Sequence, residues 1–394
     1  HMNYKIIKNA KILTPYSAIF NGWLLIAEKI ILNFQKGLPP ADLESQVADV
    51  IDARDNFLLP GFIDEHTHGS LGFCTMDADP GKIRAMAERN ASHGVTAFLP
   101  TTLTDQKRNI IRAIEAASSM VGERGKGSKV LGLHLEGPFF NTQKAGAQDP
   151  ENIRRGTKEE IYEFLDAGVI KLIAMAPEFE ENLIAGDIFT AKGITVAAGH
   201  TNANYEQLLK ATEHGYSVIT HLFNGMGAFS HREPGTIGGA LAIPDYSCEL
   251  ICDNVHSHPA AQKLAWLAKG KEKITLITDT IRPSGLPDGS YPFTDKESVI
   301  VSENGTNLRL SSGNLAGSAL SMDRALRNFT QNTGASLEET WRCSSLNAAI
   351  NLGISNETGS IEKGKLADII LMDENFEVKM TIIEGQIVFS KGLV

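Results

Sequence analysis

Histidines and carboxylates close several short apolar runs of this sequence, although a buried strand has no packing reason to end in such residues. The run FIDEHTHG, residues 62–69, places His66 and His68 one residue apart. Side-chain direction alternates along a strand, so both imidazoles of an H-x-H pair point to the same side. Taken alone, the pair is equally consistent with two interior histidines that find hydrogen-bond partners in the core.

Further side chains of this kind end other apolar runs. Glu136 ends the run LHLE, where a buried carboxylate is costly unless it is paired or bound to a metal. His200 and His221 each follow an apolar run, and each alone favours a structural histidine. Asp279 in LITDT alone is consistent with a helix N-cap. If all these residues were structural, each would need a separate reason for its position at the end of a run. One shared metal site would explain all of the positions together. Imidazole and carboxylate ligands suit zinc, iron or manganese.

These residues belong to a repeated pattern of apolar runs and helix-like segments. The eight runs cover residues 57–68, 94–102, 129–138, 170–178, 193–201, 216–224, 248–256 and 273–280. The helix-like segments cover residues 81–94, 108–123, 157–168 and 205–215. Such alternation predicts βα units and a parallel sheet. Eight units predict the α/β class and a (β/α)₈ barrel, whose active site lies at the C-terminal ends of the strands.

Most of the runs end on polar or ionisable residues: His66 and His68, Thr101 and Thr102, Glu136, Glu178, His200, His221, His256 and Asp279. We therefore expect these side chains to meet at one end of the barrel. Outside the barrel, strand-like stretches with turn signals fill both ends of the chain. We predict one small β-sandwich module from residues 1–56 and 357–394, beside a barrel over residues 57–356.

Composition excludes several classes of protein. The 394 residues carry a net charge of −10 without a basic block, which argues against nucleic-acid binding. No apolar run approaches the roughly 18 residues of a membrane span, and the start lacks the pattern of a secretory leader. Cys74, Cys248, Cys252 and Cys343 lack zinc-type spacing and predict reduced thiols. We expect a cytoplasmic protein without nucleic-acid or membrane partners.

The order of short motifs resembles the amidohydrolase superfamily over nearly the whole chain. In chain order the motifs are PGFIDEHTHG, HLEGPF, GHT, THLFNGM, REPG, DT, LAGS, NAA and GSIEKGKLAD. HLEGPF, HLFNGM and HREPGTIGG are typical of the branch that deacetylates N-acetylglucosamine 6-phosphate. The resemblance implies a metal-dependent hydrolase of amino-sugar catabolism that releases acetate and glucosamine 6-phosphate.

The resemblance also implies a role for individual residues. The implied ligands of one or two divalent ions (Zn, Fe or Mn) are Glu136, His200, His221, His66 and His68, with Glu136 as the bridge. Asp279 is the implied acid and base. The implied contacts to the phosphorylated amino sugar are Ala147, Gln148, Asn224, Gly225, Arg232, His256, Leu315, Ala316 and Gly317. In the family the residue matching His256 reaches the neighbouring subunit's site, which implies a homodimer.

Two departures and several alternatives remain open. Gln148 stands where many members of this branch carry a histidine, so it can donate a hydrogen bond to the substrate carbonyl but cannot carry charge. Lys171 lies at the wrong end of its run to bridge two metals, which argues against a dihydroorotase-like enzyme. The alternatives are deacetylation of the galactosamine isomer, another amidohydrolase activity, or a non-enzymatic barrel that binds a protein.

Overall fold

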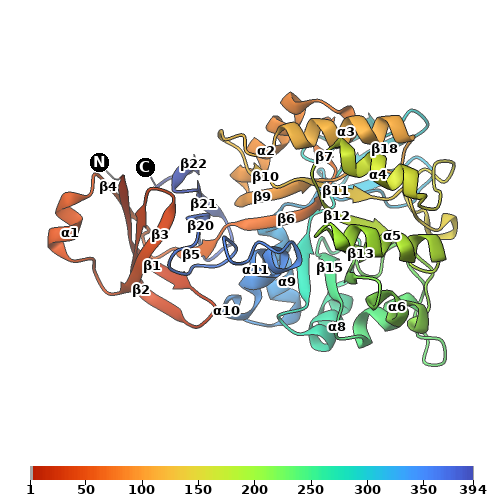
Figure 1. Ribbon diagram of the computed structural model, residues 1–394. Coiled ribbons are helices and arrows are strands. Elements are labelled where there is room, and N and C mark those ends of the chain that lie inside the picture. Colours follow the sequence, from red (N-terminus) through yellow and green to blue (C-terminus); the bar gives the residue numbers. More distant parts are fainter. Residues whose placement is uncertain (1–2, 394) are drawn as a thin grey trace.

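The computed structural model describes residues 3–393, which form a sheet module beside a larger α/β body (Figure 1). The module contains one eight-stranded sheet in the order β22-β21-β20-β5-β1-β2-β3, with β4 paired to β1. Its strands are β1 (Tyr4–Leu13), β2 (Ala18–Ala27), β3 (Ile30–Lys36), β4 (Asp49–Asp52), β5 (Phe57–Pro60), β20 (Ile369–Met372), β21 (Val378–Ile383) and β22 (Gln386–Ser390). The short helix α1 (Ala41–Gln46) also belongs to this part of the chain.

The predicted module from both ends of the chain is thus confirmed, with a difference in its architecture. Its strands share one hydrogen-bonded sheet instead of forming two sheets, because β5 joins β1 of the first segment to β20 of the last. Strand β5 lies inside the range that we assigned to the barrel. The domain limits at residues 56 and 357 stay a prediction.

The α/β body contains the eight predicted barrel strands in the predicted order. They are β6 (Phe62–Thr67), β9 (Val95–Pro100), β11 (Leu133–Glu136), β12 (Ile170–Met175), β13 (Thr195–Ala198), β14 (Tyr216–Ile219), β15 (Ser247–Ile251) and β16 (Ile274–Ile277). The helices that follow them are α2 (Pro80–Ser92), α3 (Lys107–Ser119), α4 (Lys158–Ala167), α5 (Glu180–Ala191), α6 (Tyr205–Thr212), α7 (Gly235–Ala242), α8 (Pro259–Lys269) and α9 (Met322–Thr333). The chain then continues through α10 (Leu337–Thr340), the 3-10 turn η3 (Trp341–Ser344) and α11 (Leu346–Asn351).

The regular ladder around the barrel is interrupted at two seams, so the eight strands do not form one closed sheet. One ladder joins the short β10 (Lys129–Val130) to β9 and β6, and the other runs from β11 to β16. An isolated bridge between Thr101 and His134 spans the first seam. At the second seam, the Asp279 amide donates to the His66 carbonyl oxygen at 2.9 Å. Strand β6 leaves its regular register after Asp64, where its ligand-type residues begin.

Alternate residues of the barrel strands enter two different cores. On β12, Leu172 and Ala174 belong to the core shared with α11, whereas Ile173 and Met175 belong to the core that includes α4 and α5. This alternation follows from the two-residue period of a strand. Because both faces are covered, the strands read as continuous apolar runs. A polar residue in such a strand must therefore find its partner inside the protein.

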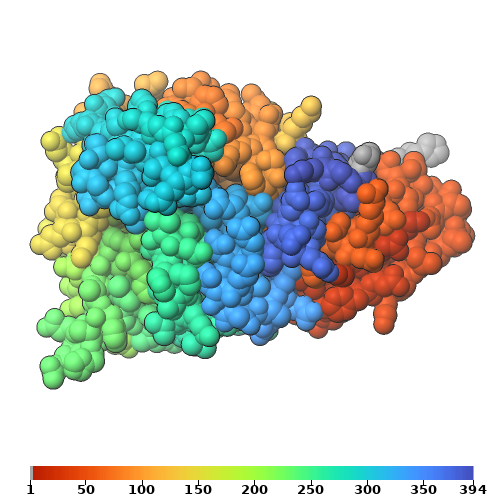
Figure 2. All heavy atoms as spheres, turned by 180° about the vertical axis from the view of Figure 1, so that it is seen from behind, coloured from red at the N-terminus to blue at the C-terminus, as the bar shows by residue number. Residues whose placement is uncertain are grey.

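A small additional sheet lies between β16 and α9, where no sheet was predicted. Its strands are β17 (Gly289–Pro292), β18 (Ser298–Ser302) and β19 (Asn307–Leu310), all antiparallel. Figure 2 shows this segment, in cyan, on the α/β body at the side away from the terminal sheet. Within the described residues, no helix combines the length and apolar character that crossing a membrane requires.

Candidate metal and active site

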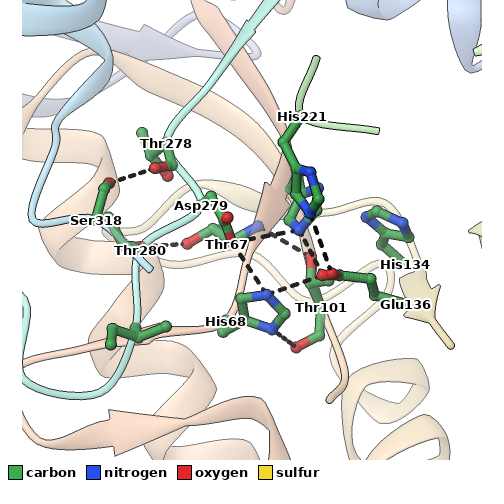
Figure 3. A network of polar contacts seen from close by, with 12 residues as sticks. Thr67, His68, Thr101, His134, Glu136, His221, Thr278, Asp279, Thr280 and Ser318 are labelled. Atoms are coloured by element: carbon green, nitrogen blue, oxygen red, sulfur yellow. Dashed lines mark hydrogen bonds and ion pairs between the residues drawn. The ribbon is translucent and has the colours of Figure 1, made fainter. Parts of the chain in front are cut away.

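Glu136, the last residue of β11, is the centre of the site. Its Oε2 lies 2.6 Å from His66 Nε2 and 3.0 Å from His68 Nε2. Its Oε1 lies 3.0 Å from His200 Nε2 and 3.6 Å from His221 Nε2. Four imidazoles from β6 and from the ends of β13 and β14 therefore converge on one carboxylate. Figure 3 shows His68, His221 and Glu136 of this cluster.

The ligand-type atoms form two groups that share Glu136. One group contains His66, His68, Glu136 and Asp279, and the other contains Glu136, His200 and His221, with the atoms of each group within 4.8 Å of one another. Asp279 Oδ1 completes the first group, at 3.1 Å from His68 Nε2 and 3.3 Å from His66 Nε2. Six of the predicted strand-end side chains are thus brought together, and their two groups match two adjacent cation positions. Glu178, which we expected to join them, instead accepts hydrogen bonds from Asn141 and Asn202.

The ring nitrogens that face away from Glu136 are held by hydrogen bonds. The acceptors are backbone carbonyl oxygens of Thr101 for His68, Lys144 for His200 and Asn224 for His221, at 3.1, 2.8 and 2.9 Å. A donated Nδ1–H leaves Nε2 with a lone pair, which is the form that binds a metal. The Nε2 atoms of His200 and His221 lie only 3.2 Å apart. Two lone pairs at that distance need a proton or a cation between them, so this donor set fits a divalent metal.

The electrostatics of the cluster favour positive charge beside the carboxylates. Burial works against ionisation of Glu136, but the charges of His66 and His68 outweigh it and lower the Glu136 pKa well below its ordinary value. The pKa of Asp279 is lowered against burial by the same two histidines. Burial also opposes charge on His68, yet the nearby carboxylates raise its pKa to about 9. Two ionised, buried carboxylates thus face the H-x-H pair.

Three of the strand-end residues have a left-handed backbone. The φ angles of His200, His221 and Asp279 are +43°, +27° and +50°. Such angles cost a non-glycine residue on the order of 1–3 kcal/mol and cluster at functional sites. Hydrogen bonds hold Asp279 in this conformation, because its N–H donates to the His66 carbonyl and its carbonyl accepts the Ser318 N–H at 2.7 Å. The backbone therefore fixes where its carboxylate points.

A cavity of about 140 Å³ borders the cluster. Its lining includes most of the residues expected to contact substrate, namely Ala147, Gln148, Asn224, Gly225, His256, Leu315, Ala316 and Gly317. A Cβ on Gly225 would lie 3.0 Å from His200 Nδ1, and a Cβ on Gly317 would lie 2.5 Å from the Asp279 carbonyl oxygen. Only glycine lets these two loops pass so close to the ligand-type residues.

Two predicted substrate contacts differ in their surroundings. His256 lines the cavity of its own chain, and its contribution to a partner's site stays a prediction. Its Nε2 lies 2.8 Å from the Ala316 carbonyl oxygen and its Nδ1 lies 2.6 Å from Asp253 Oδ2, so the turn after β15 holds it there. Arg232 is exposed on the loop before α7 and does not line the cavity. Within the described residues it forms no hydrogen bond or ion pair, so the alternative pairing with Glu233 is absent as well.

Gln148 is buried directly beside Glu136. Its Nε2 donates to Glu136 Oε1 at 3.0 Å, and its Oε1 accepts the Thr104 N–H at 2.8 Å. Both ends of the amide are therefore already engaged. A hydrogen bond from Gln148 to a substrate carbonyl would have to replace the bond to Glu136.

Two buried ionisable residues near the cluster, Glu249 and His134, were not predicted from the sequence. Glu249 Oε1 lies 2.9 Å from His66 Nδ1. His134 Nδ1 donates to the Glu65 carbonyl at 3.0 Å, and burial, together with the charge of His66, lowers the His134 pKa to about 3. A signal was present, since each residue interrupts an apolar run. The strand-end pattern selects only residues that end a run, and these two lie before the ends.

The fold and the clustered ligands define a class of hydrolase, and comparison with known proteins agrees. The amidohydrolase family model matches residues 57–388, and the chain belongs to this family. It is 39% identical to N-acetylglucosamine-6-phosphate deacetylase of Bacillus subtilis strain 168, over 98% of this chain and 97% of that protein. N-acetylgalactosamine-6-phosphate deacetylase of Escherichia coli O157:H7 is 34% identical, over 97% of this chain and 98% of that protein. The crystal structure of N-acetylglucosamine-6-phosphate deacetylase from Thermotoga maritima has a TM-score of 0.87 at 33% identity, covering 98% of this chain and all of that one (100%).

Proposed function

We propose that this protein hydrolyses N-acetylglucosamine 6-phosphate to glucosamine 6-phosphate and acetate. The observation that carries the proposal is the convergence of four imidazole Nε2 atoms on Glu136, with Asp279 adjoining. This constellation lies beside a cavity bordered by glycine-containing loops. The relatives that share nearly the whole chain support the choice of substrate.

The metal would be held by the two groups around Glu136. His200 and His221 with Glu136 offer one position, and His66 and His68 with the other oxygen of Glu136 offer a second. The ligand set suits Zn, Fe or Mn, bound as one or two ions. A divalent ion there supplies Lewis-acid chemistry, since it makes water more acidic and polarises a carbonyl.

Asp279 is the proposed acid and base. It accepts a proton from the water that attacks the acetamide carbon, and it returns that proton to the departing amine, which cannot leave as an anion. Its position next to His66 and His68 places it beside the proposed ligands. Asn224, Gly225 and the loop at Leu315–Gly317 orient the sugar along the cavity. The phosphate contact predicted for Arg232 stays a prediction, because this side chain lies outside the cavity.

A second candidate substrate is N-acetylgalactosamine 6-phosphate. The relative from Escherichia coli O157:H7 bears that activity in its name and aligns over nearly the whole chain. The two sugars differ only in the configuration at C4, and the reaction at the acetamide is the same. The homodimer and the cytoplasmic location predicted from the sequence stay predictions. Light scattering of the purified protein tests the first.

The test is acetate release by protein loaded with Zn²⁺, Fe²⁺ or Mn²⁺, with metal analysis on the same samples. We expect turnover of N-acetylglucosamine 6-phosphate, slower turnover of the galactosamine isomer, and little turnover of unphosphorylated N-acetylglucosamine. A faster galactosamine reaction would select the second candidate. Protein that binds a full equivalent of metal and releases no acetate from any of the three would contradict the proposal.

A further inference from the structure

Glu249 is a buried carboxylate in the middle of β15, behind the ligand cluster. Its exposed fraction is 0%, and within the described residues no lysine or arginine pairs with it. A carboxylate without a lysine or arginine partner in such a place is costly, so its remaining contacts must compensate for the lost hydration. Those contacts identify what the residue does.

One oxygen of Glu249 contacts both halves of the cluster. Oε1 lies 2.9 Å from His66 Nδ1 and accepts the backbone N–H of His221 at 3.3 Å. The Glu249 carbonyl accepts the N–H of Leu222 at 2.8 Å. His66 and His221 belong to different groups around Glu136, and His221 has the left-handed φ of +27°. Glu249 therefore touches the H-x-H side and the strained turn after β14 at once.

His66 differs from the other three histidines in its outer partner. His68, His200 and His221 donate their Nδ1–H to backbone carbonyls, and no side-chain substitution removes such an acceptor. Only His66 faces a side-chain acceptor. A carboxylate behind a ligating histidine fixes its tautomer and orientation, and loss of such a partner typically weakens metal binding 10–100-fold.

We propose that Glu249 is a positioning residue for the metal centre, which holds His66 with Nε2 toward Glu136 and fixes the His221 backbone. This inference rests on the proposed metal ligation. A competing role is that of a direct ligand, because His66, His134 and Glu249 also form a group within 4.8 Å. His134 Nε2 has no hydrogen-bond partner among the described residues. The buried Glu65 carboxyl shares a side-chain hydrogen bond with Glu249, and burial together with the Glu249 charge raises the Glu65 pKa well above its ordinary value, so Glu65 can donate this bond. The contact of 2.9 Å between His66 and Glu249 is, however, that of a hydrogen bond.

The test compares Glu249→Gln and Glu249→Leu with wild type. Glutamine keeps an oxygen for the two donors without the negative charge, whereas leucine fills a similar volume without an acceptor. Thr275→Val is the matched control, because Thr275 pairs with Glu249 across β15 and β16 and is equally buried. Each protein is stripped of metal and titrated with Zn²⁺ against a competing chelator, and circular dichroism verifies the fold.

We expect Glu249→Leu to weaken the affinity for one Zn²⁺ equivalent by 10–100-fold, with Glu249→Gln and Thr275→Val within threefold of wild type. Equal affinity of the folded leucine variant and wild type would overturn the inference. An equal loss of Zn²⁺ affinity in Glu249→Gln and Glu249→Leu would also overturn it, as would the loss of one whole Zn²⁺ equivalent in Glu249→Gln. Either result would indicate that Glu249 binds the metal directly. If Glu249→Leu does not fold, a tenfold weaker Zn²⁺ affinity of Glu249→Gln would still overturn the inference. Wild type that binds no Zn²⁺ would instead contradict the proposed function.

Discussion

Glu136 and Asp279 are buried carboxylates beside the same two imidazoles, yet their surroundings give them different capacities. Both oxygens of Glu136 face imidazole nitrogens, and Gln148 adds a donor. Asp279 faces the same histidines through Oδ1, and within the described residues no amide side chain donates a hydrogen bond to it. Its side chain keeps 12% exposure and borders the cavity. This difference supports the proposal that Asp279, and not Glu136, exchanges a proton with the substrate.

The substitution Asp279→Asn tests the proposed acid and base role, because it replaces one carboxylate oxygen with an amide nitrogen. We expect kcat for the proposed deacetylation to fall by about 10²–10⁴-fold, because an amide cannot accept and return the proton. The bound metal per chain should stay at the wild-type value, as measured by elemental analysis of the same preparation. Near-normal activity would refute the acid and base assignment. Loss of metal together with activity would instead make Asp279 a ligand.

The sequence located those residues of the site whose chemistry marks the end of a strand. Glu136, His200, His221 and Asp279 could be predicted because an apolar run gives no packing reason for them. Glu249 interrupts its apolar run, but its contact with His66 depends on which strand faces β6 across the barrel, and the run does not specify that. The place of His256 depends on the direction of a turn, and neither the spacing nor the composition of the stretch DNVH specifies that direction.

At the scale of elements, the segment between β16 and α9 closes one side of the site. It carries Arg282, the small sheet β17–β19 and the loop of Gly317. Arg282 joins this segment to the 3-10 turn η1 (Thr75–Asp77), since its two terminal nitrogens lie 2.8 and 2.9 Å from the Asp77 oxygens. Burial opposes ionisation of Asp77, but Arg282 outweighs it and lowers the Asp77 pKa. The ion pair thus ties the segment after β16 to the loop that follows β6.

This ion pair predicts a defined pH dependence of stability. Asp77 has a lower pKa in the folded protein than in the unfolded chain, where it is about 4. Its ion pair therefore stabilises the folded state fully above about pH 4, and this stabilisation is lost as the pH falls through the pKa of the folded state. At pH 7 we expect Asp77→Asn to reduce the free energy of unfolding by about 1.5–3 kcal/mol. The difference from wild type should stay constant between about pH 6 and 8 and shrink below about pH 4.

Urea unfolding at several pH values measures this difference. Asp295→Asn is the control, because Asp295 is exposed and makes no hydrogen bond or ion pair with a described residue. It should match wild type throughout. A difference for Asp77→Asn that grows toward low pH would have the wrong sign and would exclude the ion pair as its cause.

The helices and strands differ in how well the sequence predicts them. The barrel strands were predictable because burial on both faces requires continuous apolar runs. The four predicted helices match α2, α3, α4 and α6. Strands β17–β19 were missed because they are short and have one exposed face, so the run SVIVS carries only two buried side chains, Val299 and Val301. The interrupted seams depend on register shifts in β6, which the run itself does not encode.

At the scale of the whole molecule, the terminal sheet and the barrel are joined by buried charge. Lys129 of β10 and Asp368 before β20 form an ion pair of 2.6 Å, with exposed side-chain fractions of 6% and 1%. Asp368 also accepts the Thr358 hydroxyl and the Glu384 N–H, each at 2.8 Å. The motif GSIEKGKLAD, residues 359–368, ends in Asp368. Its aspartate forms the connection, although its lysine partner lies 239 residues away.

Lys129→Met should therefore destabilise the junction strongly. Removing one partner leaves the other charge buried, which typically costs about 3–5 kcal/mol. The double variant Lys129→Met/Asp368→Asn should be less destabilised than Lys129→Met, because the neutral amide removes the stranded charge. Urea unfolding, monitored by tryptophan fluorescence, can show which part of the molecule is destabilised. Trp23 lies in the terminal sheet, and Trp266 and Trp341 lie in the α/β body.

The position of the tryptophans makes the outcome specific to the junction. Replacing Trp23 with phenylalanine in the same background removes the signal of the sheet. If the pair couples the two parts, Lys129→Met should lower the unfolding midpoint of the Trp23 signal more than that of the body. Lys379→Met, at a solvent-facing ion pair on β21, is the control and should change neither signal appreciably. Equal shifts of both signals in Lys129→Met would mean that sheet and body unfold as one unit, and an unchanged midpoint would show that the pair contributes nothing to the junction.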